Sequence, residues 1–171
     1  MTEKDPPQVI GVRHVGLGAR DPGALAEFYR DVLGLQVVGG SAEDSAFGAT
    51  AFLRSRPAEE SHDLALFADP AYRHTAFKVR SLADLRAFYR RVIGKGVAVK
   101  MALNHGSSLA FYFDDPEGHL VEVYWPTGLA CRQPCGEPID LVRPEEALLL
   151  DAAELAAWVG STPAVMGGGP R

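Results

Sequence analysis

Residues 13–38 read RHVGLGARDPGALAEFYRDVLGLQVV, and residues 73–98 read RHTAFKVRSLADLRAFYRRVIGKGVA. The two stretches align without a gap at an offset of 60 residues, and ten of their 26 positions are identical. The identical pairs include His14 with His74 and Gly34 with Gly94. A self-match of this extent indicates that the chain is built from two copies of one supersecondary unit.

Each copy has the same predicted order of elements. A strand comes first, and a helix follows whose N-cap is Asp21 or Ser81. Gly34 and Gly94 stand where a left-handed C-terminal cap belongs. The opening strands are expected at about residues 9–19 and 72–80, and the later ones at about 35–39, 46–54 and 62–67 in the first copy and 97–101, 108–113 and 119–125 in the second. The sequence therefore predicts an α+β fold with two βαβββ modules, whose curved mixed sheet surrounds a cavity, plus a C-terminal helix.

We expect one domain over residues 9–125, with modules at about 9–67 and 72–125. Residues 126–160 form a predicted C-terminal loop and helix, and residues 161–171 a predicted flexible tail. The helix at residues 145–159 has an apolar stripe that could pack across a dimer interface or cover the chain's own sheet. That stripe consists of Leu148, Leu149, Ala152, Leu155, Ala156 and Val159.

Composition argues against several classes of function. The net charge is −5 with acidic and basic residues interspersed, so nothing suggests a nucleic-acid partner. No apolar run is long enough to cross a membrane. The opening MTEKDPPQ lacks the apolar stretch of a secretory signal, so we expect a cytoplasmic protein. Cys131 and Cys135 are accordingly interpreted as free thiols, with a local disulfide as the alternative.

Four metal-capable side chains are related by the repeat. The offset of 60 residues pairs His14 with His74 and also pairs His62 with Glu122. A two-fold relation between the modules would bring all four toward one point. Glu122 lies in an otherwise apolar strand, where a carboxylate is costly unless it is paired or bound to a metal. Two histidines and one carboxylate that leave open coordination positions are typical of non-heme Fe(II) oxygenases.

The chain resembles a known superfamily through this repeat and two motifs, RHVGL at residues 13–17 and DPEGHLVEVYW at residues 115–125. These resemble the vicinal-oxygen-chelate superfamily, which includes glyoxalase I, bleomycin-resistance proteins and type I extradiol dioxygenases. The resemblance covers about residues 9–125 and is greatest to a single-domain type I extradiol dioxygenase. It implies iron held by His14, His74 and Glu122. The resemblance also implies three further catalytic residues, His62, His105 and Tyr112.

The resemblance implies Fe(II)-dependent extradiol cleavage of a catechol-type substrate by dioxygen. Tyr112 and His105 would contact the substrate edge, and His62 would act as the acid–base group. His119 belongs to the turn of the motif and is expected to hydrogen-bond locally rather than to bind metal. For Phe47, Phe52 and Phe111 we expect core packing, with lining of an apolar pocket as the alternative.

Two rival functions remain open at this point. A glyoxalase-like isomerase or lyase would use all four positions as ligands, with Mn, Ni, Co or Zn as alternatives to iron. A bleomycin-resistance-like protein would bind a small molecule without a metal. Modules of this type commonly pair, so a homodimer is possible. The expected partners are a small aromatic substrate and dioxygen.

Overall fold

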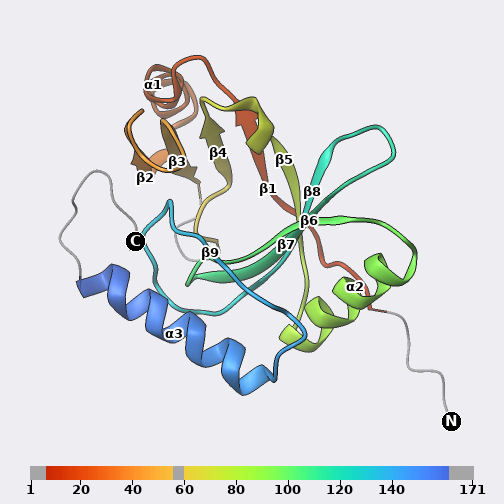
Figure 1. Cartoon of the computed structure of the whole chain (residues 1–171). Helices are drawn as coiled ribbons and strands as arrows, with labels where there is room; N and C mark the ends of the chain where they lie inside the picture. The colour runs from red at the N-terminus through yellow and green to blue at the C-terminus, as the bar shows by residue number, and fades with distance from the viewer. Residues whose placement is uncertain (1–6, 56–59, 162–171) are drawn as a thin grey trace, which may run out of the picture.

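The computed structural model describes residues 7–55 and 60–161, and it confirms the two βαβββ modules (Figure 1). The first module comprises β1 (Gly11–Gly18), α1 (Pro22–Leu33), β2 (Gln36–Ser41), β3 (Thr50–Arg54) and β4 (Leu64–Phe67). The second comprises β5 (His74–Lys78), α2 (Leu82–Gly94), β6 (Val99–Asn104), β7 (Ser108–Asp114) and β8 (Leu120–Pro126). A 3-10 turn at Pro70–Tyr72 joins the modules, and β9 (Glu137–Pro138) and α3 (Glu145–Ser161) follow.

All nine strands form one curled mixed sheet in the order β2-β3-β4-β1-β5-β8-β7-β6-β9. The pairs β1–β4 and β5–β8 are parallel, and the other pairs are antiparallel. The helices lie on the outside of the curled sheet, α1 over the first module and α2 and α3 over the second (Figure 1). The predicted fold class is therefore confirmed. The short strand β9 was not predicted, because two residues carry no alternation pattern.

A local two-fold axis relates the modules at the junction of β1 and β5. These strands run antiparallel, and Val15 lies opposite Thr75, its own counterpart in the repeat. On either side of that pair, His14 lies opposite Ala76, and Gly16 lies opposite His74. The two histidines therefore occupy symmetric positions about the axis, one on each central strand.

The repeat offset changes before the last strand of each module, which corrects one prediction. Gly16 on β1 pairs with Ala65, and its counterpart Ala76 on β5 pairs with Glu122. Ala65 is thus the structural equivalent of Glu122, at an offset of 57 rather than 60 residues. The pairing of His62 with Glu122 was wrong because the segments between the opening and closing strands differ in length by three residues. His62 lies just before β4, not on it.

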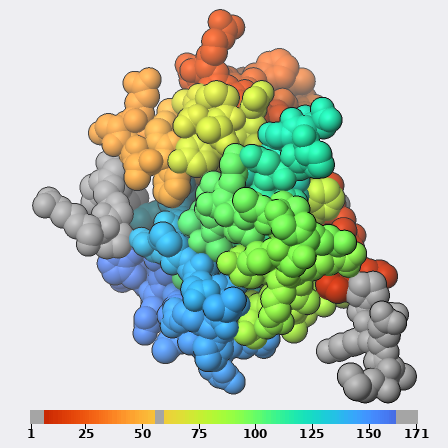
Figure 2. Space-filling model, turned by 45° about the vertical axis from the view of Figure 1, so that its right-hand side comes forward, coloured from red at the N-terminus to blue at the C-terminus, as the bar shows by residue number. Residues whose placement is uncertain are grey.

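The main hydrophobic core lies between the second half of the sheet, α2 and α3. Leu85, Phe111 and Leu148 are fully buried there. In the space-filling view, α3 (blue) packs against the second module (green) (Figure 2). The α3 stripe therefore covers the chain's own sheet, although Leu149 remains 44% exposed. The predicted tail at residues 162–171 lies outside the described residues, whereas Ser161 ends α3.

The helix caps follow the prediction at three of four positions. The carboxylate of Asp21 accepts a hydrogen bond from the amide of Ala24, and the Ser81 hydroxyl accepts one from Asp84. Gly34 caps α1 with φ of 70°. The fourth prediction was wrong, because Gly94 is still helical and Gly96 takes the left-handed conformation with φ of 75°. Among the described residues, the helices are too short and too polar to cross a membrane.

A candidate metal centre in the concave face of the sheet

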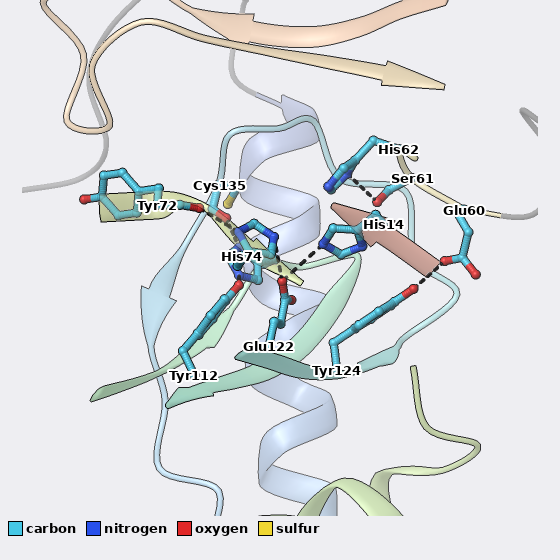
Figure 3. Close-up of polar contacts among 11 residues, drawn as sticks. His14, Glu60, Ser61, His62, Tyr72, His74, Tyr112, Glu122, Tyr124 and Cys135 are labelled. Carbon is cyan, nitrogen blue, oxygen red and sulfur yellow. Dashed lines mark hydrogen bonds and ion pairs between the residues drawn. The ribbon is translucent and has the colours of Figure 1, made fainter. Parts of the chain in front are cut away.

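Three side chains from the central strands meet inside the curled sheet (Figure 3). His14 comes from β1, His74 from the first position of β5, and Glu122 from the middle of β8. Glu122 Oε2 lies 3.1 Å from His14 Nε2 and 3.2 Å from His74 Nε2. One ligand atom from each of the three lies within 4.8 Å of the others, so the group could hold a metal ion. The sequence-predicted ligand set is therefore brought together.

The hydrogen bonding of His74 orients it as a ligand. Its Nδ1 donates to the carbonyl of Tyr72 at 2.7 Å, which leaves the Nε2 lone pair facing Glu122. Although Nε2 lies 3.2 Å from the carboxylate, it is buried and makes no hydrogen bond. Two electron-pair donors that face each other at this distance favour a cation between them, either a proton or a metal ion. A backbone partner on the far ring nitrogen is the usual support of a metal-binding histidine.

Electrostatics keep the carboxylate of this cluster ionised. Burial by itself would raise the pKa of Glu122, but His14 and His74 hold that pKa well below its usual range. Burial would lower the pKa of His74, yet the adjacent Glu122 more than offsets this and raises it. An anionic oxygen between two imidazole nitrogens is a donor set that suits a divalent transition metal. The residues present therefore fit the ion that the sequence predicts.

His62 approaches the same point from the opposite side of the cavity (Figure 3). Its ring centroid lies 4.4 Å from that of His14 and 5.0 Å from that of Phe52. Its Nδ1 is 3.0 Å from the Ser61 hydroxyl. Removal from water, followed by the neighbouring His14, lowers the pKa of His62 well below its ordinary value. His62 is not part of the three-residue group, so it stands beside the candidate ligands as a neutral imidazole.

His105 and Tyr112 form a hydrogen-bonded pair on the remaining side. Tyr112 on β7 lies directly opposite Glu122, and its hydroxyl is 2.9 Å from His105 Nε2. His105 Nδ1 makes a short hydrogen bond to the carbonyl of Cys135. Because Nδ1 donates there, Nε2 accepts from the Tyr112 hydroxyl. Removal from water raises the pKa of Tyr112 well above its ordinary value and lowers the pKa of His105, so both are neutral near pH 7.

The cavity around these groups is mostly aromatic, with an empty volume of about 750 Å³ that includes its open mouth. Phe47 and Phe52 line it, so the pocket alternative holds for them, whereas Phe111 is fully buried in the core. Sequence reasoning missed Gln133 and Cys135, which close one side from the C-terminal loop. Gln133 Nε2 donates to the carbonyl of His105 at 3.0 Å. No periodicity marks a loop contact of this kind.

A second polar chain supports His14 from the side. The ring of Tyr124 lies 5.1 Å from that of His14, and its hydroxyl donates to Glu60 at 2.9 Å. Glu60 also accepts from Lys78 Nζ at 2.6 Å. Strand alternation places Tyr124 on the same face as Glu122, so its inward position was predictable although its role was not. His119, by contrast, is exposed and bonds to Asp115. It is not a ligand, as predicted.

With this geometry in place, comparison with known proteins decides the family. A profile of the Glyoxalase/Bleomycin resistance protein/Dioxygenase superfamily matches residues 11–123. The chain belongs to this superfamily. The match covers nearly the same stretch as the resemblance noted in the sequence.

Individual relatives show how far this likeness extends. The chain is 33% identical over 112 residues to biphenyl-2,3-diol 1,2-dioxygenase 3 of Rhodococcus globerulus, covering 58% of this chain and 55% of that protein. It thus spans about half the length of the curated relatives it matches. The Mn(II)-bound glyoxalase of Novosphingobium aromaticivorans superposes with a TM-score of 0.58 at 28% identity, over 70% of this chain and 40% of that one.

A shorter relative shares the fold at nearly full length. Methylmalonyl-CoA epimerase of Mycobacterium tuberculosis superposes with a TM-score of 0.53 at 22% identity, over 73% of this chain and 93% of that one. This likeness shows the fold alone. One module pair, as found here, therefore makes up almost the whole of a known member of the fold.

Proposed function

We propose that this protein is an Fe(II)-dependent extradiol dioxygenase that opens the ring of a catechol-type substrate with dioxygen. The observation that carries the proposal is the separation of roles around the cavity. Three residues could hold a metal, and His62, His105 and Tyr112 line the same cavity outside that group. Identity to a biphenyl-2,3-diol dioxygenase over 112 residues supports the same reaction class.

His14, His74 and Glu122 would hold the ion on one face and leave the opposite positions open. A ferrous ion in such a triad binds both oxygens of a vicinal diol and passes electron density from the diol to dioxygen. The protein's own contribution is to place the reactants side by side in a cavity that largely excludes water. The aromatic lining, including Phe47 and Phe52, suits the flat apolar face of a catechol ring.

The neutral histidine and tyrosine side chains handle protons. The Tyr112 hydroxyl stays protonated and can donate to a diol oxygen, which favours the singly deprotonated diol. His105 fixes the direction of that hydroxyl through its own bond to the Cys135 carbonyl. His62 is neutral beside His14, so it can accept a proton from the entering diol and return it as the bond between the two oxygen atoms breaks.

The test is anaerobic reconstitution with Fe(II), addition of a catechol panel, and then admission of oxygen. We expect oxygen uptake coupled to a ring-fission product that absorbs visible light. His62→Ala should retain iron and turn over at least about 100-fold more slowly, as expected for loss of an acid–base group. His119→Ala, an exposed histidine bound only to Asp115, is the matched control and should be unaffected. Iron binding without oxygen uptake on any catechol would contradict the proposal.

A metal-dependent isomerase or lyase is the second candidate, and the 28% identity to a Mn(II)-bound glyoxalase favours it. In that case turnover would proceed without oxygen and with metals other than iron. Hemithioacetals and acyl-CoA epimers under anaerobic conditions are the discriminating substrates. Homodimer formation and a cytoplasmic location stay predictions from the sequence.

A further inference from the structure

A polar groove continues outward from the metal cavity. The cavity and the groove share Phe52, His62 and Tyr124 in their linings, so a molecule bound in one can extend into the other. Beyond those shared residues the groove is lined by Arg54, Glu60 and Arg132. The cavity is mainly aromatic, whereas this extension carries charge. The two together would suit a molecule with an apolar ring and an ionised side chain.

Strand alternation directs Arg54 toward the groove. On β3, Ala51 and Leu53 pack in the core cluster beneath α1, so Phe52 and Arg54 face the concave side. The ring of Phe52 lies 5.0 Å from that of His62. Two residues along a strand advance it by about 7 Å. Arg54 therefore follows Phe52 along the groove at a distance that a short substituent on a bound ring can reach.

The charge of Arg54 is not neutralised by the acidic residue nearest to it. The carboxylate of Glu60 is already taken, since one oxygen pairs with Lys78 at 2.6 Å and the other accepts from Tyr124 at 2.9 Å. Arg54 Nη1 reaches only the Glu60 carbonyl, at 3.4 Å. Its Nε is buried without a hydrogen-bond partner in the described parts of the chain. Arg132 adds a second positive charge to the same groove.

We infer that this groove binds a carboxylate on a short side chain of the substrate, and that Arg54 is the residue that recognises it. The preferred substrates would be catechols with an arylalkanoic acid side chain rather than unsubstituted or alkyl catechols. A guanidinium presents a planar pair of N–H donors that matches the two oxygens of a carboxylate. The placement of the ring rests on the proposed function, but the carboxylate site itself does not.

Binding of ligands that lack the diol tests the groove independently of any reaction. Isothermal titration of the metal-free protein would compare 3-phenylpropionate with 3-phenylpropanamide, which differs only in charge. We expect the acid to bind about tenfold more tightly or better, as one charge-assisted contact implies. Arg54→Met should abolish this difference, and Arg90→Met on the exposed face of α2 should preserve it. Equal binding of acid and amide by the native protein, or no binding of the acid, overturns the inference.

Two further arms keep the inference separate from folding and from catalysis. Arg54→Lys retains the charge without the planar fork, so it should show an intermediate acid preference. If Arg54→Met does not fold, the native protein and Arg54→Lys decide the question. With turnover, Arg54→Met should raise KM for 3-(3,4-dihydroxyphenyl)propionate about tenfold and leave 4-methylcatechol unchanged. Turnover of both with no effect of Arg54→Met would sink the groove but not the dioxygenase, whereas Arg54-dependent binding without turnover would do the reverse.

Discussion

Ala65 occupies in the first module the position that Glu122 occupies in the second. Each pairs with the corresponding residue of its central strand, Ala65 with Gly16 and Glu122 with Ala76. The two histidines obey the internal symmetry, but the carboxylate has no counterpart. The candidate centre therefore has three ligands rather than four, and the space beside Ala65 is filled by Phe52 and Phe67.

Ala65→Glu should restore the missing carboxylate at a cost in stability. Ala65 is fully buried among aromatic rings, so an unpaired carboxylate there should destabilise the metal-free protein by about 2–4 kcal/mol. A divalent ion should recover part of the loss, because the new side chain faces the cluster. Urea denaturation with and without metal measures both effects, and Ala68→Glu on the exposed end of β4 is the control. Unchanged stability in Ala65→Glu would refute the equivalence.

Tyr112→Phe should impair substrate binding without loss of metal. The hydroxyl faces the cavity and bonds to His105 at 2.9 Å, but Tyr112 is not in the ligand group. We expect kcat/KM to fall by about tenfold or more, as for one lost hydrogen bond to an ionised group, with iron content unchanged. Steady-state kinetics and metal analysis on the same sample decide this. A parallel loss of iron would show instead that the hydroxyl supports the ligands.

Tyr124→Phe should destabilise the fold around His14. Its hydroxyl donates to Glu60, whose other oxygen pairs with Lys78, and burial and then Glu60 raise the pKa of Tyr124. Removing this bond to a carboxylate should cost about 1–2 kcal/mol in the free energy of unfolding. Tyr89→Phe on α2, where the ring packs on Phe111, is the control with a small effect. Equal losses in the two variants would mean that the Glu60 contact contributes nothing.

His105 should make stability depend on pH in a defined direction. Removal from water lowers the pKa of His105 in the folded protein, while the unfolded chain keeps a value of about 6.5. Above that pH both states are neutral and no stability is lost. As the pH falls below about 6.5, the unfolded chain binds a proton that the folded one resists, so stability decreases. His105→Gln should flatten the slope between about pH 5 and 7, and an unchanged slope would contradict the assignment.

The opening of each module could be predicted because its repeat obeys local rules. Helical spacing and N-caps placed α1 and α2, and the strand period placed Glu122 and Tyr124 on one face. The shared Arg-His pair located the two histidines that flank the axis. These features depend on residues that are close together in the chain, so a single sequence contains them.

The errors arose where non-local geometry decides. The pairing of His62 with Glu122 assumed a constant offset, whereas strand register is set by loop length and pairing. Gly94 looked like a cap, but α2 continues through it and Gly96 makes the turn. The contacts of Gln133 and Cys135 with His105 come from a loop that crosses the cavity, and no pattern in residues 126–143 predicts where such a loop will lie.

Metal binding by ligand variants tests the central claim most directly. Anaerobic Fe(II) titration, followed by metal analysis after gel filtration, would compare the native protein with Glu122→Ala and His62→Ala. The account predicts one ion per chain in the native protein and in His62→Ala, and none in Glu122→Ala. Loss of iron in His62→Ala to the same extent as in Glu122→Ala would contradict a three-residue centre and would make His62 a fourth ligand, as an isomerase requires.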